Sequence, residues 1–152
     1  MRETKAGGNF LTVYRASAGS GKTFTLAAEY IAKLLQQPAS AHRGILAVTF
    51  TNKATAEMKQ RITSQLYGIS RGLADSQDYV AKITSDETIQ NWYQQLCNKP
   101  SASPTPPLEQ LVRNNCRKAL TMIIHDYHRF RIETIDSFFQ TIIRELAHDL
   151  NL

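Results

Sequence analysis

Cysteine and long hydrophobic runs are both scarce in this sequence. The two cysteines, Cys97 and Cys116, lack the paired spacing of a zinc site or a redox motif, so we expect free thiols in a reducing compartment. Residues 1–9 are polar and lack the apolar segment of a secretion signal, and no apolar run approaches the length of a membrane span. We therefore expect a cytoplasmic protein that does not enter a membrane.

The composition is that of an ordinary globular protein. The 152 residues suffice for one domain, and 42% hydrophobic with 20% charged residues excludes collagen, coiled-coil rods and extensive disorder. Eighteen Lys and Arg outweigh thirteen Asp and Glu, which gives a net charge of +5. This excess favours a polyanionic partner such as nucleic acid but does not identify one.

Hydrophobic periodicity in the first half predicts alternating strands and helices. A strand over 10–14 runs into a loop of small residues and then a helix with apolar positions over 26–35, which Pro38 ends. The apolar run 45–50 predicts a parallel strand buried on both faces. A second helix follows, with apolar positions over 54–66, Asn52 as its N-cap and an end near Gly68 and Gly72.

The second half predicts two helices, one over 89–96 and one over 108–127, joined by a proline-rich linker at 99–107. A third strand is expected over 130–135, and Ser137 with Gln140 has the spacing of a capping box. The fold class predicted is therefore α/β, a partial parallel sheet with a helical insertion. We expect the first part of the domain at 1–74, the insertion at 75–129 and the return to the domain at 130–152.

The loop between the first strand and helix has the spacing of a phosphate-binding motif, G-x-x-x-x-G-K-[ST], with Ala16 in place of the first glycine. Backbone N–H groups at such a helix N-terminus surround phosphate oxygens. Lys22 would reach the β- and γ-phosphates, and the Thr23 hydroxyl would bind Mg²⁺. The predicted ATP-binding residues are Ala16, Ser17, Ala18, Gly19, Ser20, Gly21, Lys22 and Thr23.

Three stretches resemble motifs of superfamily 1 DNA helicases of the UvrD type, particularly the RecB and AddA branch. Residues 13–25 resemble the nucleotide-binding motif, 47–58 (AVTFTNKATAEM) resemble motif Ia and 133–138 (ETIDSF) resemble motif Ib. The long insertion between the second and third motifs is similar to that of the RecB and AddA nuclease-helicases. The resemblance implies a P-loop, RecA-like fold.

The resemblance also implies a function. We expect the N-terminal ATP-binding part of an ATP-dependent DNA helicase in repair or recombination, with ATP and Mg²⁺ as cofactors. Single-stranded or duplex-end DNA, the rest of the helicase chain, and an exonuclease or partner subunit would be its partners. Lys22 and Thr23 would serve catalysis, and DNA would lie near Phe50, Thr51, Asn52, Thr134 and Ser137. The fragment alone is expected to be inactive.

Other interpretations of these residues remain open. Phe50 could be the last core residue of its strand, with Asn52 and Ser137 only as helix caps. Asp136 stands where many relatives carry histidine. A small P-loop kinase or a non-catalytic nucleotide-binding module are the rival functions.

The acid and the arginine that ATP hydrolysis requires are not found in the sequence. The nearest candidate, Asp126 after residues 122–125, belongs to a helical pattern, and Asp86-Glu87 is typical of a helix N-terminus.

The histidines and the residues of the insertion have a structural interpretation. We expect the four histidines to be solvated or part of a basic patch: His42, His125, His128 and His148. Trp92 and Tyr93 are expected to fill a small core of the insertion. The alternative DNA surface is Arg113, Arg117 and Lys118.

Overall fold

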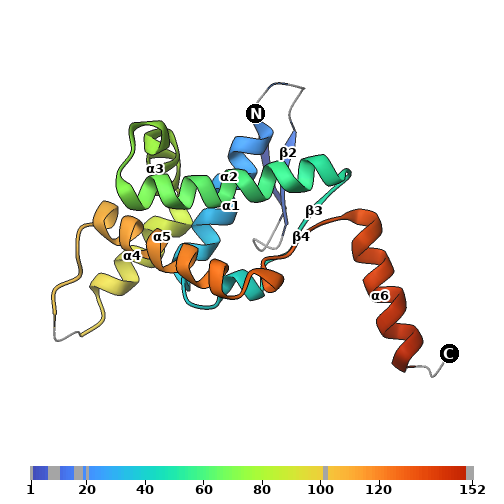
Figure 1. Cartoon of the computed structure of the whole chain (residues 1–152). Helices are drawn as coiled ribbons and strands as arrows, with labels where there is room; N and C mark the ends of the chain where they lie inside the picture. Colours follow the sequence, from blue (N-terminus) through green and yellow to red (C-terminus); the bar gives the residue numbers. More distant parts are fainter. Residues whose placement is uncertain (1, 7–10, 16–18, 20, 101–102, 150–152) are drawn as a thin grey trace.

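The structure is a computed structural model that describes residues 2–6, 11–15, 19, 21–100 and 103–149. A body of packed helices carries two small sheets, and the last helix projects away from it (Figure 1). The strands are β1 (Arg2–Ala6), β2 (Leu11–Arg15), β3 (Ala47–Thr49) and β4 (Ile132–Thr134). The helices are α1 (Lys22–Gln36), α2 (Asn52–Arg71), α3 (Gln77–Thr84), α4 (Glu87–Cys97), α5 (Leu108–His125) and α6 (Ile135–Asp149), with 3-10 turns η1 (Ala41–Arg43), η2 (Ala74–Ser76) and η3 (Tyr127–Arg129).

The hydrophobic core lies between α1, α2 and α5, with α3 and α4 closing one side (Figure 1). On α5 the buried residues recur at helical spacing: Val112, Cys116, Ala119 and Ile123. Asn115 also donates a hydrogen bond from Nδ2 to the carbonyl of Leu35, near the end of α1, at 2.8 Å. The helices of the predicted insertion and those beside the predicted phosphate loop therefore share one core.

Two separate sheets replace the single parallel sheet that we expected. β3 and β4 pair in parallel, with Ala47 opposite Ile132 and Thr49 opposite Thr134. β2 instead forms an antiparallel hairpin with β1, and the sequence analysis did not predict β1. A neighbouring segment pairs with little loop-closure cost, which accounts for the hairpin. The result is a mixed α/β fold, mostly helical, with a small parallel sheet.

The expected burial of the second strand on both faces is wrong. Only residues 47–49 form β3, and Val48 is 42% exposed. A two-stranded sheet gives a strand one neighbour, and the helices here cover only part of it. The third strand is also shorter than expected, because Phe130 belongs to the preceding turn and Ile135 begins α6.

Two helix caps differ from prediction in the same way. Thr51, not Asn52, caps α2, and its Oγ1 accepts a hydrogen bond from the N–H of Ala54 at 3.0 Å. In α6 the N–H of Ser137 donates to Oγ1 of Thr134 at 3.2 Å, so Ser137 lies inside the helix and does not cap it. Each helix begins earlier than expected because the last residue with extended backbone supplies the acceptor.

The other helix boundaries largely follow the sequence signals. α1 ends at Gln36, before Pro38, and α2 ends at Gly72, whose φ of +70° favours glycine. Asp86 caps α4 by accepting from the N–H groups of Thr88 and Ile89, as expected of a helix N-terminus. The short helix α3 was not predicted. No helix in the described ranges is long and apolar enough to span a membrane.

The core assignment predicts that two adjacent isoleucines of α5 contribute very differently to stability. Ile123 is fully buried and Ile124 is 64% exposed. Ile123→Ala should lower the free energy of unfolding by about 2–5 kcal/mol because it leaves a cavity, while Ile124→Ala should change it by less than about 0.5 kcal/mol. Urea denaturation of the two variants measures the difference, and equal losses would contradict this packing.

Candidate functional site

The described end of the predicted phosphate loop has a backbone that favours glycine. Gly19 and Gly21 have φ of +76° and +79°, and Gly21 precedes α1. A Cβ at either position would meet no described atom within 4 Å, so conformation rather than crowding favours glycine there. Helix α1 begins as the N–H of Thr25 donates to the Gly21 carbonyl at 2.9 Å. Ala16, Ser17, Ala18 and Ser20 lie outside the described residues.

The first turn of α1 is suited to an anion. Lys22 and Thr23 are both exposed there, and the turn contains no acidic residue. The partial positive charge of a helix N-terminus adds to the charge of Lys22. A cavity of about 290 Å³ borders this turn, lined by Thr12, Val13, Tyr14, Lys22, Thr25 and Leu26. The exposed amine of Lys22 and hydroxyl of Thr23 at this helix N-terminus have the chemistry that would hold a phosphate group and its metal ion.

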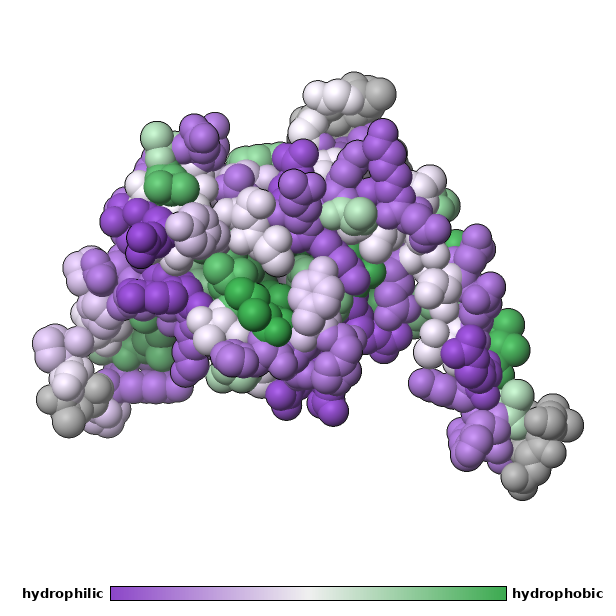
Figure 2. Space-filling model, in the orientation of Figure 1, coloured by the Kyte–Doolittle hydropathy of each residue, from purple (hydrophilic) through white to green (hydrophobic). Residues whose placement is uncertain are grey.

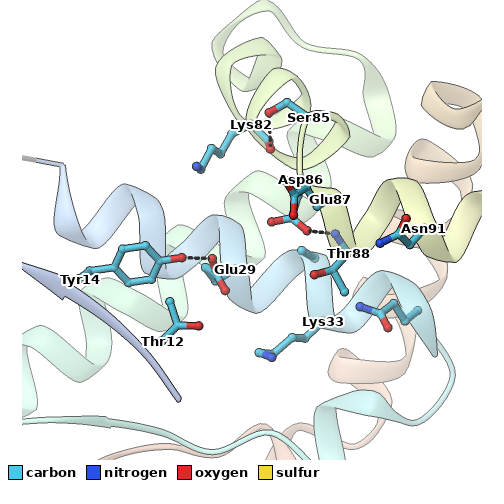
Figure 3. A pocket seen from close by; sticks show the side chains of 12 residues that line it. Thr12, Tyr14, Glu29, Lys33, Lys82, Ser85, Asp86, Glu87, Thr88 and Asn91 are labelled. Carbon is cyan, nitrogen blue, oxygen red and sulfur yellow. Dashed lines mark hydrogen bonds between the residues drawn. The ribbon is translucent and has the colours of Figure 1, made fainter. Parts of the chain in front are cut away.

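A second cavity, of about 480 Å³, lies along α1 toward its C-terminal half, between β2 and the junction of α3 with α4 (Figure 3). In it the Tyr14 hydroxyl donates to Glu29, which connects β2 to α1. Lys33 and Lys82 line the cavity together with Glu29 and Glu87. Because this lining mixes both signs of charge, it does not select one class of ligand. The sequence analysis did not predict this cavity.

The predicted DNA residues gather at one edge of the β3–β4 sheet. Since Thr49 pairs with Thr134 in a parallel ladder, the segments that follow both strands leave on the same side. Phe50 is 86% exposed directly after β3, so it is not a core residue. Asn52 and Ser137 are also exposed, in the first turns of α2 and α6. Two helix N-termini therefore flank an exposed aromatic ring at this edge.

The turn after β3 is held by threonine side chains. Oγ1 of Thr49 lies 2.6 Å from Oγ1 of Thr55, and it also donates to the carbonyl of Thr51 at 3.2 Å. With the Thr51 cap, these bonds fix the backbone on both sides of Phe50. The aromatic ring is thus presented on an ordered turn.

Comparison with known proteins identifies the family. Residues 4–152 match the UvrD/REP helicase N-terminal domain. The chain belongs to this family. It is 43% identical over 86 residues to DNA helicase II of Rickettsia typhi, covering 55% of this chain and 12% of that protein. It is 49% identical over 51 residues to the RecBCD enzyme subunit RecB of Chlamydia trachomatis, covering 34% and 5%.

A third relative, DNA helicase II of Escherichia coli, is 46% identical over 72 residues, which cover 47% of this chain and 10% of that protein. The chain thus spans about a tenth or less of the length of these relatives. No solved structure matches it. Because helicase II and RecB proteins both match, the comparisons support the helicase family and not one branch of it.

Asp136 has a structural explanation at the start of α6. It is exposed in the first turn of α6, where a carboxylate interacts favourably with the helix dipole. A negative charge at this position therefore stabilises the helix end that carries Ser137.

Asp126 does not follow a strand. It lies at the C-terminal end of α5, and the residues before it are helical, as their periodicity indicated. Its Oδ2 accepts from Nε of Arg43 at 2.7 Å and faces Nε2 of His42 at 3.3 Å, while Nδ1 of His128 lies 3.3 Å from Oδ1. This carboxylate joins η1 to η3 and lies among cations. We therefore interpret it as a structural residue.

We expected the four histidines to be solvated or part of a basic patch, and solvation is wrong for His42, whose side chain is 1% exposed. Its burial follows from the contact with Asp126, 84 residues later in the chain, which satisfies one ring nitrogen. His125, His128 and His148 are exposed, as expected. In the described part of the chain, no cluster of His, Cys, Asp and Glu side chains could hold a metal ion.

The aromatic residues of the insertion have structural partners. Trp92 is half-buried against the shared core, and the Tyr93 hydroxyl donates to the carbonyl of Pro106 at 3.0 Å. This bond fastens the described end of the proline-rich linker to α4. The core beside Trp92 is thus shared with α1 and α2.

Both cysteines are free thiols, with Cys97 exposed and Cys116 buried, and burial raises the pKa of Cys116 to about 12.

The Asp126 contacts predict an acid-sensitive contribution to stability. Burial raises the pKa of the Asp126 carboxyl, but the hydrogen bonds from His42 and Arg43 lower it by a larger amount. The pKa therefore lies below the usual 3.8. A carboxyl whose pKa is lower in the folded protein than in the unfolded chain stabilises the fold at pH values above its pKa in the unfolded chain. This stabilisation is lost as the pH falls through its pKa in the folded protein. Asp126→Asn should therefore lower the urea midpoint of unfolding near neutral pH. The difference in urea midpoint between this variant and wild type should become smaller below pH 3.8.

Urea titrations across this pH range measure the gap. Asp149→Asn is the control, because Asp149 is exposed at the end of α6 and should show little gap at any pH. A gap that stays constant down to the acid limit would contradict the ionic role of Asp126.

Proposed function

We propose that this chain is the N-terminal ATP-binding part of an ATP-dependent DNA helicase of the UvrD/RecB type. The observation that carries the proposal is the parallel pairing of β3 with β4, because it brings two helicase motifs far apart in sequence to one edge. Membership of the helicase family supports it. In this proposal residues 1–74 and 130–152 belong to the motor domain, with the helices of 75–129 inserted between them.

The nucleotide would bind at residues 16–23. Lys22 would contact the β- and γ-phosphates, and the hydroxyl of Thr23 would hold Mg²⁺. The left-handed Gly19 and Gly21, the acid-free first turn of α1 and the cavity beside Lys22 support this assignment. Bound Mg-ATP supplies the free energy of translocation through its hydrolysis. Lys22 and Thr23 orient the phosphates, and the acid and arginine would come from elsewhere in the helicase.

Single-stranded DNA would bind across the edge where β3 and β4 end. Phe50 offers an exposed ring for base stacking, and the polar groups of Thr51, Asn52, Thr134 and Ser137 lie near the N-termini of α2 and α6. Both helix N-termini favour phosphate. The Thr49–Thr55 contact supports this role because an ordered turn loses less entropy when it binds.

A packed path joins the two sites. Tyr30 of α1, two turns beyond Lys22, meets Phe130 edge-on with ring centroids 5.8 Å apart. Phe130 is 1% exposed and stands just before β4, whose end carries Thr134. We propose that movement of α1 on nucleotide binding reaches the DNA edge through this contact. A rigid interior transmits such displacements.

Within the family we propose the RecB and AddA branch, in repair or recombination beside an exonuclease or partner subunit. The length of the helical segment between the second and third motifs supports this branch. Single-stranded and duplex-end DNA would be the substrates. A small kinase is not supported, since the chain belongs to a helicase family.

Nucleotide binding can be tested at one lysine. Lys22→Ala should weaken Mg-ATP or ADP binding at least tenfold, because it removes the cation that faces the phosphates. Lys33→Ala is the control: Lys33 is also an exposed lysine of α1, but it lines the other cavity. Titration calorimetry measures both affinities. Equal binding by wild type and Lys22→Ala would contradict the assignment.

The DNA edge can be tested at Phe50. Phe50→Ala should weaken binding of labelled oligo-dT at low salt by about 1–3 kcal/mol, because it removes one stacking platform, and Asn52→Ala should weaken it less. Phe139→Ala is the control, since that ring is 55% exposed on α6 and lies outside the predicted track. Fluorescence anisotropy measures the affinities.

If neither Phe50→Ala nor Asn52→Ala changes affinity in a folded protein, the track lies elsewhere. Arg117 and Lys118, both exposed on α5, then become the candidates. Arg113 is less suited, because its guanidinium lies over Gly72 at the end of α2.

A further inference from the structure

A cluster of cations lies at the sheet edge opposite the proposed single-strand track. The turn η1 ends shortly before β3, and η3 ends shortly before β4. Because the strands are parallel, both turns stand at their amino ends, and the three-residue strands, about 10 Å long, separate them from the edge that carries Phe50. This cationic edge comprises Arg43, Lys59, His128 and Arg129, arranged around Asp126 and Tyr127.

One carboxylate organises most of the cationic edge. Arg43 approaches Asp126 through Nε at 2.7 Å, and Arg129 approaches it through Nε at 3.9 Å. The two arginine side chains are 47% and 56% exposed, whereas that of Asp126 is 13% exposed. Among the described residues, the terminal guanidinium nitrogens of neither arginine have a hydrogen-bond partner. The partly buried Asp126 thus holds two arginines whose side chains are about half exposed.

The cationic edge carries more positive charge than its one carboxylate can balance. Asp126 balances one of the two arginines, and Lys59 adds a further positive charge 5.4 Å from the centroid of the Tyr127 ring. The nearby Glu133 is engaged by Arg131 at 2.7 Å, so it does not offset the cluster. Guanidinium groups fixed in place and open to solvent are the side chains that bind phosphate in two-pronged fashion.

We propose that the cationic edge binds the phosphate backbone of duplex DNA. The surroundings of Tyr127 favour a duplex over a single strand. Its side chain is 51% exposed, but Nζ of Lys59 lies over the ring and Phe130 packs beside it, so a stacking base would have to displace Lys59. Single strands gain much of their affinity from stacking, whereas a duplex offers a denser row of phosphates. The proposal rests on the proposed function, in which duplex lies beside the strand being tracked.

The test compares two pairs of charge-removing substitutions in the 152-residue protein. The first is Arg43→Gln with Arg129→Gln, and the matched control is Arg71→Gln with Lys99→Gln, which removes the same charge from exposed positions outside this edge. Anisotropy measures binding of a blunt duplex of about 20 base pairs and of oligo-dT, from about 50 to 200 mM salt. Thermal melting verifies folding, and Arg129→Gln alone serves if the double variant unfolds.

We expect the first pair to weaken duplex binding about tenfold at low salt and to reduce the salt slope by about 2, since two phosphate contacts are lost. Oligo-dT binding should change no more than in the control pair. Arg43→Lys with Arg129→Lys should retain more duplex affinity than the glutamine pair but less than wild type, because it keeps the charge and loses the two-pronged contact.

Unchanged duplex binding in the first pair, or an equal loss in the control pair, would overturn the proposal. Displacement of the duplex by polyglutamate at equal charge concentration would also overturn it, in favour of an acidic protein partner. The proposed function fails separately, since it predicts loss of oligo-dT binding in Phe50→Ala whatever the arginine variants do.

Discussion

The packing of α5 against α1 and α2 is the interaction on which the rest of the structure depends. A two-stranded sheet is not stable by itself in water, so β3 and β4 take their positions from the helices around them. The buried side of α5, from Val112 to Ile123, completes the core that α1 and α2 begin. The helices between β3 and β4 are therefore part of the core of this domain. Without it, the two strands that carry the proposed DNA contacts would lack a common support.

The two edges of the β3–β4 sheet, which these helices hold in place, differ in their side chains. At the amino edge, Asp126 connects η1 to η3 with the buried His42 and half-exposed Arg43, so the strands enter the sheet from turns held by charge. At the carboxyl edge, Thr51 and Thr134 cap the helices that follow. The partly buried Asp126 thus anchors exposed arginines on one side, and helix N-termini lie on the other. Exposed guanidinium groups and helix N-termini both favour anions, which is the basis for proposing a polyanion at each edge.

Local signals in the sequence predicted what local interactions decide. Pro38 marked the end of α1 and Asp86 the start of α4. The apolar spacing of the helix predicted over 108–127 was a weaker guide, because Ile124 and Tyr127 in it are 64% and 51% exposed. The caps were misplaced because threonine, asparagine and serine all supply suitable acceptors, and only the backbone angles select among them. The burial of His42 could not be predicted, since its partner is 84 residues away. The phosphate-binding motif stays a prediction from residue spacing, whereas the cavities and the cationic edge depend on tertiary packing and could not be predicted.

Helix α6 differs from the other long helices in how it is held. None of its residues is buried. Its exposed apolar side chains are Ile135, Phe139, Ile143 and Leu146, and Figure 2 shows hydrophobic side chains at the outer margin of this helix. A helix of 15 residues is marginal alone in water, so the start of α6 depends on β4 and on the Thr134 cap. Phe50, in contrast, precedes α2, which buries Met58, Ile62 and Leu66 in the core. The two sides of the proposed track therefore differ in rigidity: the Phe50 side is fixed by the core, and the Ser137 side can adjust to the strand it meets.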